Sequence, residues 1–100
     1  MKVKATMKAD KVLVKLLAKH PMETGLRKDK GTGDLIPAKY IQELTCKHKD
    51  KFVFIADFGR SVSKDPYLSF TFSGGQSGET LTLAWIDSMG DSETVDAVIK

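Results

Sequence analysis

The 100-residue sequence contains a single cysteine, and its hydrophobic residues never form a long uninterrupted run. One cysteine excludes a disulfide within these residues, so a stable fold must depend on a hydrophobic core. The densest early apolar run, residues 12–18, is interrupted by Lys15 and is far shorter than the ~20 apolar residues of a membrane-spanning helix. We therefore expect one soluble domain over residues 1–100, without a membrane-spanning segment.

Arginine is also scarce, with two residues among the 16 basic ones. Because the planar arginine fork is the side chain that reads base edges, this composition argues against nucleic acid as a partner. The charges are unevenly distributed: residues 1–51 carry 13 Lys or Arg against 6 acidic residues, a net +7, and residues 52–100 carry 3 against 7, a net −4. Such asymmetry favours an oriented encounter with an acidic protein surface or an anion.

Most of the chain alternates between apolar and polar residues with a period of two, which is typical of half-buried strands. Seven short segments show the pattern, separated by Gly, Pro and polar turns. Two of these segments cover residues 40–49 and 51–58. Each segment places a set of apolar residues on one face of the expected strand. The residues expected on buried faces include Val3, Ala5, Met7, Val12, Val14, Leu16, Phe52, Phe54, Ala56, Phe58, Leu68, Phe70, Phe72, Leu81, Leu83, Trp85, Val95, Ala97 and Ile99. The sequence predicts an all-β fold: an immunoglobulin-like antiparallel β-sandwich of about seven strands, with no intradomain disulfide.

Two of the expected strands are apolar on both faces. Leu13 and Leu17 lie on the otherwise polar face of one strand, and Val53 and Ile55 lie on that of another. A two-layer sandwich leaves its outer faces to solvent, so apolar residues there indicate a covering loop or a partner. We therefore expect the isolated chain to self-associate as a homodimer or a larger species.

A long polar connection, residues 20–37, separates the second and third expected strands. Connections of this length in a small domain are usually functional or disordered. Four apolar residues argue against disorder and predict that the loop packs against another surface: Met22, Leu26, Leu35 and Ile36. Arg27, Lys28 and Lys30 make the same loop basic, and Arg27 is the best candidate for contacting an anion because its fork can bind in a bidentate manner.

This loop also carries a family resemblance. The segments KHPMETGLRKD at 19–29, LIPA at 35–38 and YIQELTC at 40–46, followed by VSKDPYLSF at 62–70 and GDS at 90–92, resemble the SoxZ family of the bacterial thiosulfate-oxidising (Sox) system. The likeness spans nearly the whole chain. It implies a non-catalytic subunit that needs no cofactor, forms a heterodimer with SoxY, and presents the sulfur intermediates held on a SoxY cysteine to other Sox enzymes.

The resemblance further implies a periplasmic location. The N-terminus lacks the uninterrupted hydrophobic region of a signal peptide, which taken alone argues for the cytoplasm, whereas the resemblance implies export together with SoxY. The residues expected to contact the partner or an anion are His20, Met22, Leu26, Arg27, Lys28, Tyr40 and Cys46.

Cys46 and His48 leave two alternatives open. Their side chains point to the same side of a strand, where a thiol and an imidazole would be placed as nucleophile and base of a thiol-dependent enzyme. A lone cysteine in a strand is more often a small buried hydrophobe. Together with His20 and Met22, these two residues also supply the ligand types of a blue-copper site, although their spacing differs from that of copper-binding β-sandwiches. We expect no catalytic, metal or cofactor site, with a thiol enzyme and a small copper protein as the alternatives.

Overall fold

The computed structural model describes residues 1–59 and 61–100. It contains seven strands: β1 (Lys2–Lys8), β2 (Lys11–Leu17), β3 (Ile41–His48), β4 (Lys51–Asp57), β5 (Tyr67–Ser73), β6 (Thr80–Asp87) and β7 (Ser92–Val98). In these two ranges no helix is present, and therefore none that is long and apolar enough to cross a membrane. The predicted all-β fold is confirmed.

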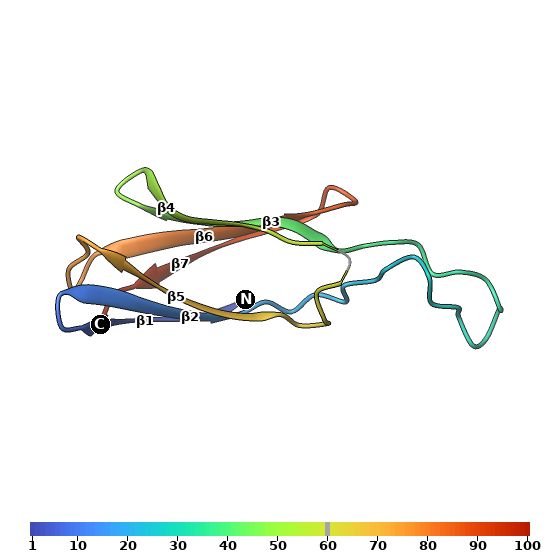
Figure 1. Ribbon diagram of the computed structural model, residues 1–100. Helices are drawn as coiled ribbons and strands as arrows, with labels where there is room; N and C mark the ends of the chain where they lie inside the picture. The colour runs from blue at the N-terminus through green and yellow to red at the C-terminus, as the bar shows by residue number, and fades with distance from the viewer. Residues whose placement is uncertain (60) are drawn as a thin grey trace.

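The strands form two antiparallel sheets packed face to face (Figure 1). The three-stranded sheet has the order β1-β2-β5, and the four-stranded sheet has the order β4-β3-β6-β7. Tight turns join β1 to β2, β3 to β4 and β6 to β7, each within one sheet. The chain changes sheet at the connections after β2, β4 and β5, and this crossing is what makes the two layers a sandwich.

The core lies between the sheets and follows the period-two pattern. Val12, Val14 and Leu16 of β2 are almost completely buried against Leu81 and Leu83 of β6 in one cluster. Each buried Val or Leu side chain contributes about 1.5–3 kcal/mol to the hydrophobic stabilisation. The alternation therefore predicted these inward faces correctly.

Phe52 is an exception, and the prediction that it lies in the core is wrong. A β-bulge between Cys46 and Lys47 shifts the β3–β4 register, so that Cys46 pairs with Phe54 but Lys47 pairs with Phe52. Phe52 consequently points outward with 54% of its surface exposed, and the Lys47 ammonium lies 4.7 Å from its ring centroid. An extra residue in one strand reverses the faces beyond it, which strict alternation cannot anticipate.

The long connection forms a protruding arm, which we define as residues 21–39 (Figure 1). Its two sides pair at Glu23 and Lys39, which exchange backbone hydrogen bonds of 2.7 and 2.9 Å, and again near the tip at Lys28 and Leu35. The arm gives the molecule its elongated shape, with extents of 52 × 21 × 17 Å. The outer half of the arm does not pack against the sandwich, because Leu26 is 80% and Leu35 is 58% exposed, and the surface that the sequence predicts for these residues stays a prediction.

Candidate functional site

The arm joins the sandwich through a small second core. Ala18, Met22 and Ile41 are buried there, with Tyr40 and Trp85 packed around them. The Met22 sulfur accepts the backbone N–H of Ile41 at 3.4 Å. Met22 has a φ of 49°, a left-handed conformation that is uncommon for a side chain of this size, so its burial and hydrogen bonds hold it in place. Met22 and Tyr40, both predicted to contact a partner, lie at the base of the arm.

A buried carboxylate, Asp87, organises this base. Its Oδ2 accepts hydrogen bonds from His20 Nε2 at 3.0 Å and Lys39 Nζ at 2.9 Å. Its Oδ1 accepts the backbone N–H groups of Met89 and Asp91 at 2.9 and 3.0 Å. We call His20, Lys39 and Asp87 the arm-base cluster, because it ties both ends of the arm to the turn between β6 and β7.

The electrostatics of Asp87 follow from these contacts. Burial alone would raise the pKa of its carboxyl group, but the hydrogen bonds from His20, Lys39 and the two backbone N–H groups outweigh burial and hold the pKa well below its usual range. Lys39 also forms an ion pair with the exposed Asp91, and its two carboxylate partners raise the pKa of its ammonium group. The cluster is therefore a charged, internally satisfied structural centre.

Both ring nitrogens of His20 are used within the protein. Nδ1 accepts the backbone N–H of Met22 at 3.0 Å, so the ring proton lies on Nε2, which donates to Asp87. The ring also packs edge-on against Trp85, with centroids 5.0 Å apart. His20 is thus positioned to fix the start of the arm, and it has no free nitrogen for a metal or an anion.

Arg27 lies on the arm and is paired with Glu23. Its Nε and Nη2 donate to the two carboxylate oxygens of Glu23 at 3.2 and 2.5 Å, and this bidentate pairing lowers the pKa of Glu23. Leu26 and Lys28, the other candidates in this segment, flank Arg27 in the chain and are exposed. The arm therefore places an internally neutralised Arg27 between a solvent-exposed leucine and a solvent-exposed lysine.

Cys46 and His48 lie at the opposite end of β3. Cys46 is completely buried in the main core, and burial raises the pKa of its thiol to about 11. His48 Nε2 is 2.9 Å from Glu79 Oε1, and its ring packs against Phe72. No hydrogen bond joins Cys46 to His48 in the part of the chain that the structure describes. A buried, protonated thiol without a base is a poor nucleophile.

The four ligand types considered for copper do not converge. Met22 lies against Ile41 at the first residue of β3, whereas Cys46 and His48 are five and seven residues farther along that strand. At about 3.3 Å per residue, these distances are roughly 16 and 23 Å. His20 is engaged with Asp87, at the same end as Met22. The structure brings two of the candidates together at the arm base and leaves the other two in the sandwich.

The sequence did not single out Lys39 or Asp87. Asp87 ends β6 and accepts the N–H of the residue two positions later, as an ordinary turn-forming aspartate does. Its other oxygen accepts hydrogen bonds from His20, 67 positions earlier in the sequence, and from Lys39, 48 positions earlier. Long-range pairing of this kind leaves no local signal.

Acid pH is expected to destabilise the fold through Asp87 and Glu79. Hydrogen bonds from Lys49, His48 and the Gln76 N–H lower the pKa of Glu79 to about 2. A carboxyl group with a lower pKa in the folded state stabilises it above the unfolded-state pKa, near 4, and loses this contribution as pH falls toward the folded-state value. The free energy of unfolding, measured with urea, should therefore decrease between about pH 5 and pH 2.

Glu79→Gln provides the control for this titration. The variant removes one of the two groups, so the decrease with pH should become less steep than in the unmodified chain. A slope unchanged by the substitution would contradict the assignment of this titration to Glu79.

The comparisons with known proteins point to one family. No curated protein matches the chain significantly. The sequence model of the family described as "Sulphur oxidation protein SoxZ" matches residues 1–98 and so covers both sheets and the arm. The chain therefore belongs to the SoxZ family, and its role lies in sulfur oxidation.

Proposed function

We propose that this chain is the non-catalytic subunit of a SoxYZ sulfur carrier, in which it binds SoxY and presents the sulfur intermediates on the SoxY cysteine to other Sox enzymes. The family match supports the pathway. The observation that carries the pairing is an exposed apolar surface on the outer face of the four-stranded sheet. We place the complex in the periplasm, to which this chain is exported with SoxY.

The outer face of the four-stranded sheet has an uncharged row across all four strands. Ile55 of β4, Thr45 of β3, Ala84 of β6 and Thr94 of β7 are cross-strand neighbours in that order. Ile86 lies beside this row on β6, and three exposed apolar side chains lie on the same face or its edge: Ile55, Phe52 and Val98. A pleated face with an uncharged row across all four strands suits packing against a second sheet.

The arm is expected to complete the interface. Seven-residue strands rise about 23 Å and four strands span about 14 Å, so the sheet face projects roughly 300 Å², whereas a stable interface uses about 800 Å² per partner. The arm precedes β3 and extends beyond the end of the sheet at which β3 begins, where it exposes Leu26 and Leu35. It is the nearest source of further apolar contact, with Arg27 and Lys28 beside it for polar or anion contacts.

The state of Cys46 supports a non-catalytic role for this subunit. Its thiol is buried and its pKa is about 11, so it is a side chain of the core. In the proposed complex, the reactive sulfur belongs to SoxY, and this chain is a binding subunit that needs no cofactor.

Co-expression with a candidate SoxY tests the proposal. Ile55→Lys places a charge at the β4 end of the uncharged row and should weaken SoxY binding at least tenfold, because the ammonium would be desolvated at the interface. Thr71→Lys, at an exposed position of β5 on the other sheet, is the matched control and should bind normally. Co-purification and titration calorimetry measure the difference, and circular dichroism checks the fold.

The isolated chain offers a second readout of the same surface. Without SoxY, we expect a homodimer or larger species in sedimentation experiments, which Ile55→Lys should dissociate. Full SoxY affinity in Ile55→Lys, combined with a monomeric isolated chain at high concentration, would contradict the proposed interface.

A further inference from the structure

The outer face of the three-stranded sheet is the opposite of its counterpart, because it is strongly basic. The outward positions of β1 and β2 hold five lysines, which we call the lysine face: Lys2, Lys4, Lys8, Lys11 and Lys15. The outward positions of β5 add Tyr67 and hydroxyl side chains but no charge. No acidic side chain occupies an outward position of these three strands, and Asp10 lies in the turn between β1 and β2.

Four of the five lysines face one another in pairs across β1 and β2, so their charges repel. Lys4 is the direct cross-strand neighbour of Lys15, and Lys8 is that of Lys11. Like charges directly opposite one another destabilise an antiparallel pair. Within residues 1–59 and 61–100, none of the five lysines forms an ion pair, although Lys39 and Lys49 do so elsewhere. The repulsion is thus not relieved inside the chain, and an acidic partner would relieve it.

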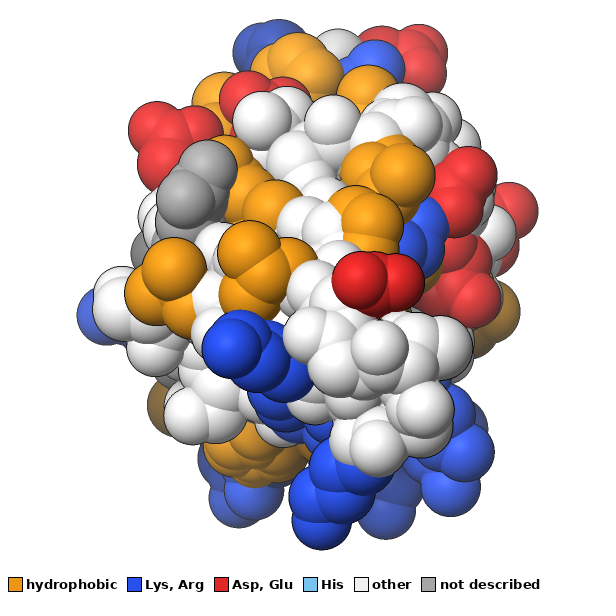
Figure 2. All heavy atoms as spheres, turned by 90° about the vertical axis from the view of Figure 1, so that its right-hand side faces the viewer, with side chains coloured by type: hydrophobic (Ala, Val, Ile, Leu, Met, Phe, Trp, Pro, Cys, Tyr) orange, Lys and Arg blue, Asp and Glu red, His pale blue; other side chains and the backbone are white. Residues whose placement is uncertain are grey.

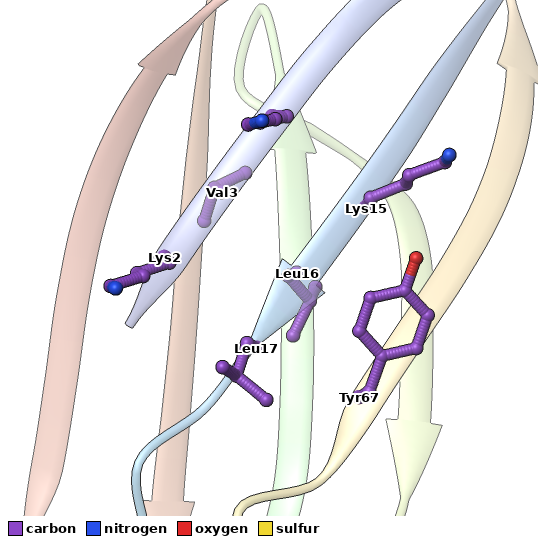
Figure 3. Close-up of a pocket in the computed structure, with 7 residues that line it drawn as sticks. Lys2, Val3, Lys15, Leu16, Leu17 and Tyr67 are labelled. Atoms are coloured by element: carbon purple, nitrogen blue, oxygen red, sulfur yellow. The ribbon is translucent and has the colours of Figure 1, made fainter.

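One end of the lysine face contains a shallow hollow with an apolar floor (Figure 3). Leu17 and Tyr67 are direct cross-strand neighbours there, and Tyr67 is 59% exposed. Lys2, Lys4 and Lys15 surround them. The hollow is therefore suited to one apolar side chain with negative charges on either side of it.

The distribution of charge orients the molecule. Figure 2 views the molecule from the arm end and shows Lys and Arg side chains gathered along the lower edge, on the side of the three-stranded sheet. The outer face of the four-stranded sheet carries Glu43, Asp57 and Asp96 against Lys47. A protein with opposite signs on its two faces approaches an acidic partner with the basic face first.

We propose that the lysine face is a docking surface for an acidic protein segment that carries an apolar residue between its acidic residues. The surface differs from the SoxY interface proposed above, because it lies on the other sheet. Lysine ammonium groups are strongly hydrated point charges that suit carboxylates without demanding a fixed geometry. Nucleic acid is less suitable, because the face has no arginine and only one aromatic ring on which bases would stack.

A nine-residue peptide with four glutamates on each side of one phenylalanine is a direct probe. Its binding to the chain is measured by fluorescence anisotropy at 0.1 M salt, where screening restricts charge effects to about 10 Å. The double variant Lys4→Glu, Lys15→Glu should bind the peptide at least tenfold more weakly. The double variant Lys28→Glu, Lys30→Glu has the same net charge but changes the arm, and it should bind within about twofold of the unmodified chain.

The hollow is tested separately. Replacing the phenylalanine of the peptide with serine should weaken binding, and Tyr67→Ser in the protein should remove most of this difference. Amide chemical-shift changes on adding the peptide should map to β1, β2 and β5. Circular dichroism verifies that the variants fold, and if the glutamate pair unfolds, Lys4→Gln with Lys15→Gln takes its place with a smaller expected loss.

Four results would overturn the proposal. Equal losses in the face and arm variants would indicate a response to net charge alone. Tighter binding of a single-stranded RNA of equal charge, lost in the same face variant, would indicate a nucleic-acid surface. Shift changes confined to the arm would move the site there, and absence of peptide binding at millimolar concentration would leave the face without an acidic ligand.

Discussion

Replacing Asp87 with alanine is expected to lower the free energy of unfolding by about 3–5 kcal/mol, the range found when one partner of a buried ion pair is removed. The variant leaves the Nε2–H of His20 and two backbone N–H groups without their acceptor, and it leaves Lys39 with the exposed Asp91 as its carboxylate partner. The His20 ring is buried, so the loss includes unsatisfied hydrogen-bonding capacity as well as the lost attraction between Lys39 and Asp87. Urea unfolding at pH 7 measures the effect.

Asp91→Ala is the matched control for this change. Asp91 also pairs with Lys39, but its carboxylate is largely exposed, so its removal should cost less than about 1 kcal/mol. Hydrogen exchange adds a local readout: in Asp87→Ala, the Glu23 and Lys39 amides at the arm base should lose protection more than amides in the middle of β3. Equal stabilities of the Asp87 and Asp91 variants would show that the arm-base cluster does not hold the fold together.

Replacing Gly75 with alanine should also destabilise the fold, by about 2–3 kcal/mol, through overpacking. Gly75 is buried in the connection between β5 and β6, and a Cβ atom there would lie 2.6 Å from Val12 Cγ2 and 3.1 Å from the Phe72 ring. Both neighbours belong to the main core, so neither can move without disturbing its own contacts. Thermal and urea unfolding measure the loss.

Gly59→Ala is the control for the general effect of removing a glycine. Among the described residues other than its chain neighbours, none has an atom within 4 Å of the Cβ position at Gly59, and its φ is not left-handed, so the substitution should be close to neutral. If Gly75→Ala proved as stable as Gly59→Ala, the close approach of the β5–β6 connection to the core would be contradicted.

The sandwich was predictable from the sequence because the alternation of apolar and polar residues that specifies each strand is a local pattern. Alternation identified the inward faces of β1, β2, β5, β6 and β7, since a period of two places each side chain on a definite face. Phe52 was misplaced because a bulge in the β3–β4 ladder, with Val53 of β4 as the unpaired residue, reversed its direction. The alternation rule depends on a continuous ladder, and sequence alone does not show where a ladder is interrupted.

The candidate site was less predictable, because its contacts join residues far apart in the chain. The arm was recognised by its length, and Met22 was correctly expected to be anchored, whereas Leu26 and Leu35 are exposed. Nothing in the composition distinguished these three apolar residues. Asp87 was overlooked because its local pattern is that of a turn, and only the folded chain shows which distant donors it meets.

The attachment of both ends of the arm to Asp87 has a mechanical consequence. His20 follows β2 of the three-stranded sheet, and Lys39 precedes β3 of the four-stranded sheet. The Asp87 carboxylate therefore holds the two ends of the arm, each next to a different sheet. A force applied to the tip of the arm therefore acts as on a lever whose pivot is Asp87, and it is shared by the two sheets.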